Sequence, residues 1–219
     1  MIFLEKKRFI FDLDDTLLEY DLEYEAKFFK DLFGEDAKII IENMDPLMKE
    51  YSLQVKKFEY SSLAEYLKEK TGLAFTPSII EEWVKFIGDM NPVLEDESII
   101  PLLKELKKDG KSIVVLSNWF SFCQLKRLKN SGLNEYFETI FTADIYCKPN
   151  KEAYLLAMGS YPIEECIFIG DSLRNDYETP RKIGMDAILF DKNDSYPEEY
   201  RRIHSFQELI DHKEDFYGK

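Results

Sequence analysis

From Ile99 to Phe190 the sequence alternates between amphipathic helical patterns and short apolar strands. Each expected strand is bounded by turn residues, and the four are Ile113–Leu116, Thr139–Phe141, Cys166–Ile169 and Ala187–Phe190. Strands that alternate with helices pair in parallel, because every connection has to cross back over the sheet. The chain is therefore expected to form an α/β fold, in which a doubly wound parallel sheet carries helices on both faces.

Capping residues and glycines mark where the helices of this region begin and end. The expected caps and stops, in chain order, are Ser98, Asp109–Gly110, Gly132, Asn150 and Gly184. Ser98 and Asn150 are residue types that cap helix N-termini, and the others are expected to end helices. The residues after Asp191 are expected to form only a loose surface helix.

Residues 20–90 have a different pattern, with apolar side chains at helical spacing and no convincing strand. The residues that carry this pattern are Leu22, Ala26, Phe29 and Phe33, then Leu47, Tyr51 and Val55, then Leu63, Tyr66 and Leu67, and finally Ile80, Val84 and Ile87. A helical insertion after the first strand is the simplest interpretation. We therefore expect an α/β core formed by residues 1–17 and 96–219, and a helical domain formed by residues 18–95.

The first strand ends abruptly on carboxylates. Phe9–Phe11 is apolar, and Asp12 and Asp14 follow it. Residues two apart on a strand point the same way, so the two carboxylates are expected to lie side by side. Such a pair repels unless a cation joins it or one member holds a proton, which is how a site for metal-assisted acid–base chemistry begins. Taken alone, the pattern also fits a solvated turn.

Three later segments place polar residues where other strands end. These are Ser117–Asn118, Lys148, and Asp171 with Asp176. Each has an ordinary structural interpretation, as a helix cap, a solvated loop lysine and a turn respectively. In an open parallel sheet, however, ligands bind beyond the carboxyl ends of the strands. The convergence of all four segments at that edge predicts a functional site.

Composition limits the partners and the compartment. The formal net charge is −14, from 29 Lys and Arg against 43 Asp and Glu, which disfavours nucleic acid and anionic membranes as partners. Cys123, Cys147 and Cys166 lack metal-site spacing and are expected to be reduced, mostly buried thiols. No apolar run approaches the ~18 residues that a membrane span needs. Only three apolar residues follow Lys6–Arg8, too few for a secretory signal, so a cytoplasmic location is expected.

The order of these motifs closely resembles the haloacid dehalogenase-like (HAD) hydrolase superfamily. The motifs are Asp-x-Asp-x-Thr at Asp12, strand-Ser-Asn at Ser117, Lys-Pro at Lys148, and Gly-Asp-Ser-x-x-Asn-Asp beginning at Gly170. The resemblance covers the whole chain and implies a Rossmann-like core with a helical cap inserted after the first motif.

The resemblance implies a role for each matched residue. Asp12 would attack phosphorus as the nucleophile and form an aspartyl-phosphate. Asp14 would protonate the leaving oxygen and then activate water, while its main-chain carbonyl would join the metal ligands. Ser117 and Asn118 would bind phosphoryl oxygens, and Lys148 would neutralise charge near the nucleophile and the phosphate.

The resemblance also implies a magnesium site. Asp171 would ligate the ion together with Asp12 and the main chain of Asp14, and Asp176 would lie close behind, as a ligand through water or as a partner of Lys148. The chemistry agrees, because a carboxylate can attack a phosphate dianion only where a cation screens their repulsion. Carboxylate oxygens and waters suit magnesium.

The predicted function is that of a magnesium-dependent phosphatase. Its substrate would be a small phosphomonoester, such as a sugar phosphate, a phosphoglycolate-like acid or a nucleotide. The resemblance favours the phosphatase branch, because haloacid dehalogenases and phosphonatases lack a carboxylic acid at the position of Asp14. The expected partner is a small phosphorylated metabolite, and the chain is expected to be a monomer or a homodimer.

Three alternatives stay open. A phosphosugar mutase of the same superfamily keeps both aspartates. A phospho-accepting receiver domain also clusters aspartates with Ser or Thr and Lys, but it lacks a large helical insertion. An inactive binding protein would not need the full set of catalytic residue types. Trp119–Phe120 stands where the family often has a small residue, so Trp119 is expected either in the core or in the pocket wall.

Overall fold

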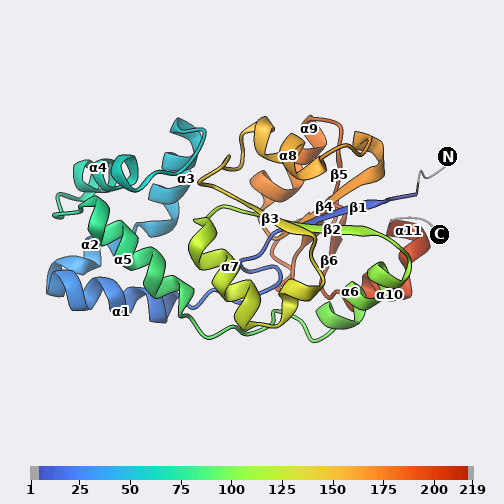
Figure 1. Ribbon diagram of the computed structural model, residues 1–219, viewed down its shortest axis with the longest axis horizontal. Helices are drawn as coiled ribbons and strands as arrows, with labels where there is room; N and C mark the ends of the chain where they lie inside the picture. The colour runs from blue at the N-terminus through green and yellow to red at the C-terminus, as the bar shows by residue number, and fades with distance from the viewer. Residues whose placement is uncertain (1–4, 217–219) are drawn as a thin grey trace.

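Six parallel strands form a single sheet in the computed structural model, which describes residues 5–216 (Figure 1). The sheet order is β3-β2-β1-β4-β5-β6. The strands are β1 (Arg8–Phe11), β2 (Ser112–Ser117), β3 (Thr139–Thr142), β4 (Cys166–Gly170), β5 (Asp186–Phe190) and β6 (Arg202–Ile203). The chain order reverses on either side of β1, which places β1 at the topological switch point where α/β sheets bind ligands. The predicted α/β fold class is confirmed.

Successive residues of β1 face opposite sides of the sheet, and both sides are buried. Phe9 and Phe11 pack against α6 (Ile99–Lys108) and α10 (Gln207–Asp211). Ile10 packs in a second cluster with the apolar side chains of α8 (Lys151–Met158). Alternation of this kind, with apolar residues on both faces, is what a parallel sheet between two helical layers requires.

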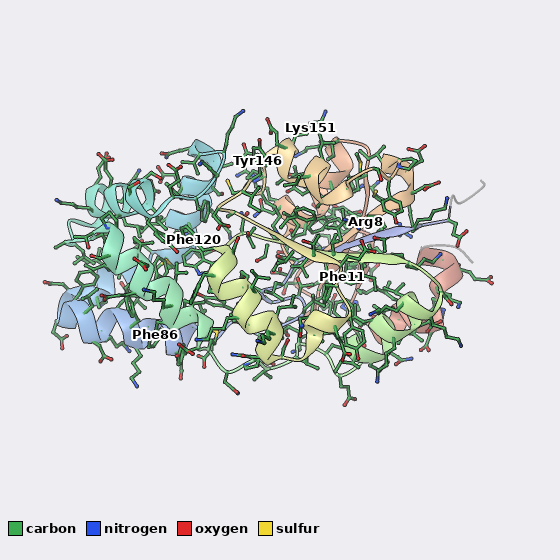
Figure 2. All side chains as sticks on the ribbon, in the orientation of Figure 1. Arg8, Phe11, Phe86, Phe120, Tyr146 and Lys151 are labelled. Atoms are coloured by element: carbon green, nitrogen blue, oxygen red, sulfur yellow. The ribbon has the colours of Figure 1, made fainter. Side chains whose placement is uncertain are left out.

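Five helices occupy residues 22–88, and this helical block contains no strand. The helices are α1 (Leu22–Phe33), α2 (Ala37–Ile41), α3 (Met44–Gln54), α4 (Tyr60–Thr71) and α5 (Pro77–Gly88). Figure 1 shows the block at one end of the molecule, with the start of β1 and α11 at the other end. The block has its own hydrophobic cluster, which also includes Trp119 and Phe120 where α7 (Ser121–Asn130) begins. Figure 2 shows Phe120 at this junction.

Side chains next to the helix ends explain the boundaries within the block. Asp21 caps α1 by accepting a hydrogen bond from Tyr24 N at 2.9 Å. Thr76 caps α5 in the same way, and Pro77 occupies the first turn, where a missing N–H costs nothing. Gly72 ends α4 with a φ of +75°, a conformation that L side chains rarely adopt.

The segment after Asp191 differs from the loose surface helix expected for it. Residues 202–203 form β6, the edge strand beside β5, and α10 follows. Ile203, Phe206 and Leu209 are completely buried in the cluster that covers one face of the sheet. The prediction was wrong because β6 pairs over two residues only, which is too short to leave a periodic pattern.

Two of the expected helix caps do not form. The Ser98 side chain makes no capping bond, and the backbone N–H of Ser98 instead donates to Asp96 Oδ1 at 2.6 Å. The Asn150 side chain donates to the carbonyls of Val55 and Cys147 rather than capping α8. Asn150 therefore ties the helical block to the loop that carries Lys148.

The remaining elements are short turns and helices between the main ones. They are η1 (Gly34–Asp36), η2 (Leu133–Glu135), η3 (Ile163–Glu165), the π-helical η4 (Leu173–Glu178), α9 (Thr179–Lys182) and α11 (Lys213–Phe216). The three cysteines are buried free thiols, as expected. Within residues 5–216, no helix has the length and apolar character that crossing a membrane requires. The cytoplasmic location stays a prediction.

Candidate active site

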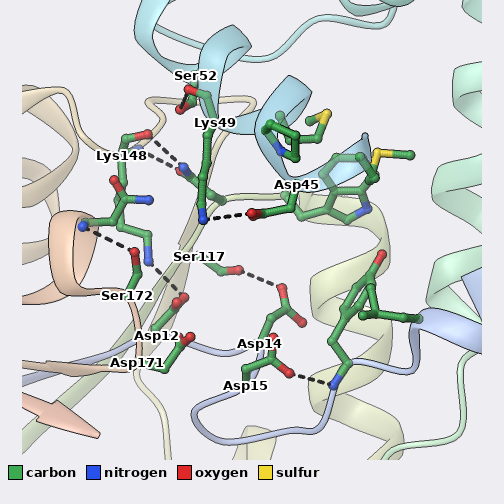
Figure 3. Close-up of a pocket in the computed structure, with 18 of the residues that line it drawn as sticks. Asp12, Asp14, Asp15, Asp45, Lys49, Ser52, Ser117, Lys148, Asp171 and Ser172 are labelled. Carbon is green, nitrogen blue, oxygen red and sulfur yellow. Dashed lines mark hydrogen bonds and ion pairs between the residues drawn. The ribbon is translucent and has the colours of Figure 1, made fainter. Parts of the chain in front are cut away.

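The carboxyl ends of β1, β2 and β4 meet at one cavity of about 450 Å³ (Figure 3). Asp12 and Asp14 follow β1, Ser117 ends β2, and Asp171 follows β4. Asn118 and Lys148 also line this cavity, and Asp176 lies directly behind Lys148. The structure thus brings together all seven residues that the sequence analysis selected.

Lys148 joins two of the carboxylates. Its Nζ lies 2.9 Å from Asp12 Oδ1 and 2.7 Å from Asp176 Oδ1. Only 1% of Lys148 and none of Asp176 is exposed to solvent. Because water does not reach these two charges, they are neutralised by the ion pair between them. Asp12 Oδ1 also accepts the N–H of Leu13 at 2.8 Å. One Asp12 oxygen is therefore held in place, and no hydrogen bond within residues 5–216 engages Oδ2.

Asn118 positions the lysine loop. Its Nδ2 donates to the Lys148 carbonyl at 2.7 Å, and the Lys148 N–H donates back to Asn118 Oδ1 at 2.6 Å. This reciprocal pair engages the Asn118 side-chain carbonyl and one N–H of its amide. The geometry adds a positioning contact to the phosphate-binding role predicted for Asn118.

The cluster of Asp12, Asp171 and Asp176 concentrates negative charge. One carboxylate oxygen from each of the three residues lies within 4.8 Å of the other two. Burial, and then the charge of Asp176, hold the pKa of Asp12 well above its usual range. Burial and the same neighbour raise the pKa of Asp171 to about 7. Three carboxylates and one lysine leave an excess of negative charge. A divalent cation that prefers oxygen ligands would neutralise this charge.

This excess charge predicts how stability depends on pH. Asp171 has a folded-state pKa of about 7 against its ordinary value of 3.8, so its contribution to stability is lost as pH rises through that interval. In EDTA, we expect Asp171→Asn to raise the melting temperature at pH 8 by several degrees, because ~1 kcal/mol corresponds to about 2–4 °C in a protein of this size. Calorimetry from pH 5 to pH 8 measures it. A variant that melts below the wild type at pH 8 would contradict the charge argument.

Asp14 is held by residues of α7 that the sequence analysis missed. Arg127 forms an ion pair with Asp14 Oδ1, and Gln124 Nε2 donates to Asp14 Oδ2 at 2.5 Å. Ser117 Oγ also donates to Asp14 Oδ2, at 3.4 Å. Arg127 and Gln124 are completely buried and three residues apart, so both lie on the inner face of α7. Charged and amide residues in an otherwise buried helical stripe were the signal that could have identified them.

The helical block supplies a second group of missed residues. Glu25 on α1 is only 5% exposed and lines the cavity, where Tyr20 Oη and Trp83 Nε1 both donate to its Oε1. Lys49 on α3 also lines the cavity and pairs with Asp45 at 2.8 Å (Figure 3). Trp119 is 7% exposed and lines the cavity as well, so it serves both as core and as pocket wall.

Comparison with known proteins agrees with this arrangement. The family model for haloacid dehalogenase-like hydrolases matches residues 6–184, which include all seven of the selected site residues, from Asp12 to Asp176. The chain belongs to the haloacid dehalogenase-like hydrolase family. The family predicted from the sequence motifs, and with it the class of enzyme as a hydrolase, is confirmed.

Two relatives of this HAD-like hydrolase act on phosphate esters, as their names state. The ribulose-1,5-bisphosphate 5-phosphatase of Halopiger xanaduensis is 26% identical over 46% of each chain, so the alignment spans about half of that relative. The pyrimidine 5′-nucleotidase PynA of Streptococcus pneumoniae is 21% identical over 94% of each chain.

A solved structure shares the fold of this HAD-like hydrolase along nearly its whole length. It is the putative HAD-hydrolase YfnB of Bacillus subtilis, described as bound to magnesium and as revealing interdomain movement. The likeness has a TM-score of 0.70 at 21% identity and covers 95% of this chain and 98% of YfnB. At this identity the likeness shows the fold alone.

Proposed function

We propose that this protein is a magnesium-dependent phosphatase that hydrolyses a small phosphomonoester through an aspartyl-phosphate on Asp12. One observation carries the proposal: the Asp12 carboxylate, the Lys148 ammonium and Asp171 converge at the carboxyl edge of the sheet, in a cavity. The named activities of the two relatives support it.

Asp12 is the proposed nucleophile. Its Oδ1 is fixed by Lys148 and by the Leu13 N–H, which leaves Oδ2 to attack phosphorus. Lys148 and the Ser117 hydroxyl lie where they can stabilise phosphoryl oxygens as charge redistributes during the transfer. The P–O bond to the leaving group breaks as the Asp12–phosphorus bond forms, and water later cleaves the aspartyl-phosphate.

Asp14 is the proposed acid and base. An alkoxide leaves poorly unless it is protonated, and the same group can afterwards take a proton from the attacking water. Arg127 and Gln124 fix the orientation of the Asp14 carboxyl group at the cavity wall. The two α7 residues thus orient the carboxyl group that is proposed to transfer protons.

Asp12 and Asp171 are the carboxylates that would hold magnesium, together with the main-chain carbonyl of Asp14. Asp171 Oδ2 accepts no hydrogen bond within residues 5–216, and Asp12 would bind the ion through the oxygen that does not attack phosphorus. Both oxygens of Asp176 are occupied, by Lys148 and by the Ser172 N–H, which favours for Asp176 the predicted role of partner to Lys148. Bound magnesium would supply charge neutralisation between the carboxylates and the phosphate.

The helical block α1–α5 is proposed to act as the cap. Glu25 and Lys49 of this block line the cavity together with the aspartates of the core. A cap of this kind excludes water from the reacting phosphate and selects the leaving group. A cavity of about 450 Å³ suits a small phosphorylated metabolite. The exact boundaries of core and cap, and the monomeric or homodimeric state, stay predictions.

Hydrolysis of p-nitrophenyl phosphate tests the proposal. We expect turnover with magnesium and its loss in EDTA, because the carboxylate cluster repels a phosphate dianion when no cation is bound. Added magnesium should restore the rate and should raise the melting temperature, since an ion that binds only the folded state stabilises it. A rate that is equal in EDTA and in magnesium would contradict the metal dependence.

The mutase alternative predicts a different product balance. A sugar phosphate would then be isomerised without release of inorganic phosphate, because the phosphoryl group returns to the sugar. Phosphate release from a panel of sugar phosphates, nucleotides and phospho-acids separates the two activities. It also narrows the substrate class.

A further inference from the structure

Glu25 is a buried carboxyl group of the helical block that the proposed phosphoryl transfer does not use. Tyr20 Oη donates to its Oε1 at 2.7 Å, and Trp83 Nε1 donates to the same oxygen at 3.1 Å. Both donors therefore hold one oxygen and fix the orientation of the carboxyl plane. Burial raises the pKa of Glu25 to about 7, so the group is ionised at pH 8.

The second oxygen of Glu25 is available to a ligand. Oε2 accepts no hydrogen bond from residues 5–216, and it is not one of the two fully buried polar atoms that lack a partner there. Glu25 also lines the cavity that contains Asp12 and Asp14. Oε2 is therefore open to the cavity, where a donor carried by a bound substrate can form a hydrogen bond with it.

The surroundings of Glu25 indicate what kind of donor fits. No Lys or Arg of the described part of the chain forms an ion pair with Glu25, and both lysines of the cavity are already paired with aspartates. Seven carboxylates line the cavity, namely those of Asp12, Asp14, Asp15, Glu25, Glu42, Asp45 and Asp171. A leaving group with a further anionic charge would be repelled, whereas a positively charged group would be attracted.

Aromatic side chains next to Glu25 favour the same ligand. Tyr20 and Trp83 contact its carboxylate directly, and the ring centroids of Trp83 and Trp119 are 4.7 Å apart. All three aromatic residues line the cavity. These side chains make the wall next to the carboxylate largely apolar, and an ion pair with an ammonium group is stronger in such surroundings than in water.

We propose that Glu25 determines substrate specificity, with Oε2 accepting a hydrogen bond from an ammonium group on the leaving group of the phosphomonoester. This inference rests on the proposed phosphatase function and names the class of ester that it prefers. The preferred substrate carries its phosphate at Asp12 and Asp171, and its amine reaches Glu25 on the helical block.

Two series of synthetic substrates, paired by the number of carbon atoms, test the inference. One is ethyl to pentyl phosphate, and the other is the same set with a terminal amine, which is protonated at pH 8. We expect the wild type to show at least a tenfold preference in kcat/KM for the amine at the best length. The chain length at which the preference peaks measures how far Glu25 lies from the bound phosphate, whatever the natural substrate is.

Glu25→Gln replaces the hydrogen-bond acceptor that faces the cavity with a hydrogen-bond donor. Trp83 Nε1–H can only donate, so the glutamine carbonyl has to face Trp83 and Tyr20, and the amide NH₂ has to replace Oε2. The preference for the amine should fall to about unity. The inductive effect of the amine on the leaving group is the same in both proteins, and any loss of folded protein cancels in the ratio.

Glu42→Gln is the matched control. Glu42 lines the same cavity and carries the same charge, but it is exposed and lies 3.6 Å from Lys38. We expect this variant to keep the wild-type preference for the amine within about threefold, since an exposed ion pair contributes little. Equal loss in both variants would mean that the total charge of the cavity, and not Glu25, selects the substrate, and would overturn the inference.

The remaining outcomes are also decisive. A wild type that hydrolyses p-nitrophenyl phosphate but has no preference for the amine at any length overturns the inference and leaves the proposed function intact. An unchanged preference in Glu25→Gln does the same. Failure of the wild type to hydrolyse any phosphate ester in magnesium overturns the proposed function, and the inference with it.

Discussion

Asp12→Asn is expected to abolish the hydrolysis of p-nitrophenyl phosphate. An amide cannot form the acyl phosphate that the proposed mechanism needs, so we expect kcat to fall by on the order of 10⁴-fold or more. The fold should persist, because the Asn carbonyl can still accept from Lys148 and from the Leu13 N–H, as Asp12 Oδ1 does. Steady-state kinetics together with near-ultraviolet circular dichroism measure both effects.

Asp15→Asn is a closely matched control for this experiment. Asp15 lines the same cavity, is exposed, and uses Oδ1 to accept the N–H of Tyr20 at 3.2 Å, which an Asn carbonyl can also do. Its φ of +55° is a conformation that Asn tolerates well. We expect less than about a threefold change in kcat, since surface substitutions of this kind have small effects. An Asp12→Asn variant as active as this control would remove Asp12 as the nucleophile.

The predictable parts of the fold are those that long sequence patterns determine. Cys166–Ile169 is completely apolar and ends on Gly170, which is sufficient to predict β4 and the position of Asp171 at its carboxyl end. The apolar side chains of α5 recur at helical spacing after Pro77, and the helix begins at that proline. Such segments form the same structure that their local pattern favours, so tertiary contacts do not override it.

The parts that could not be predicted depend on contacts between distant segments. β6 covers two residues and exists only because β5 offers it an edge. Asn150 is an ordinary capping residue, but its amide bonds to carbonyls of Val55 and Cys147 instead. Likewise, the stripe of α7 can indicate that Arg127 is buried, but it does not show that the partner is Asp14, which lies 113 positions away. Pairings of this kind become visible only in the folded chain.

The location of the site was more predictable than the identity of its neighbours. Asp12 and Asp171 each follow a strand and Ser117 ends one, and parallel strands bring their carboxyl ends to one edge. Glu25 had no comparable signal, since a Glu in the first turn of a helix is usually solvated and favourable there. Its burial against Trp83 results from how α1 and α5 pack.

Asp14→Asn is expected to slow turnover by about 10²–10⁴-fold, the usual contribution of a positioned acid or base. The step that becomes limiting should depend on the leaving group. p-Nitrophenol is acidic enough to leave without a proton, so phosphorylation of Asp12 should stay fast while hydrolysis of the aspartyl-phosphate, which needs a base, becomes slow. An alkyl phosphate needs the proton in the first step, and with it the aspartyl-phosphate should not accumulate.

Rapid-mixing kinetics therefore distinguish the loss of proton transfer from a structural disturbance of the site in this variant. With p-nitrophenyl phosphate, we expect a burst of one nitrophenol per active site, and intact-protein mass spectrometry should detect one added phosphoryl group. The control is internal, because Asp14→Asn also deprives the buried Arg127 of its charged partner, which destabilises the protein. Such a structural effect would slow both substrates alike and produce no burst. Equal slowing of the phosphorylation step with both esters, and no burst, would show that Asp14 orders the site without transferring protons. A burst confined to the aryl ester requires proton transfer by Asp14 itself.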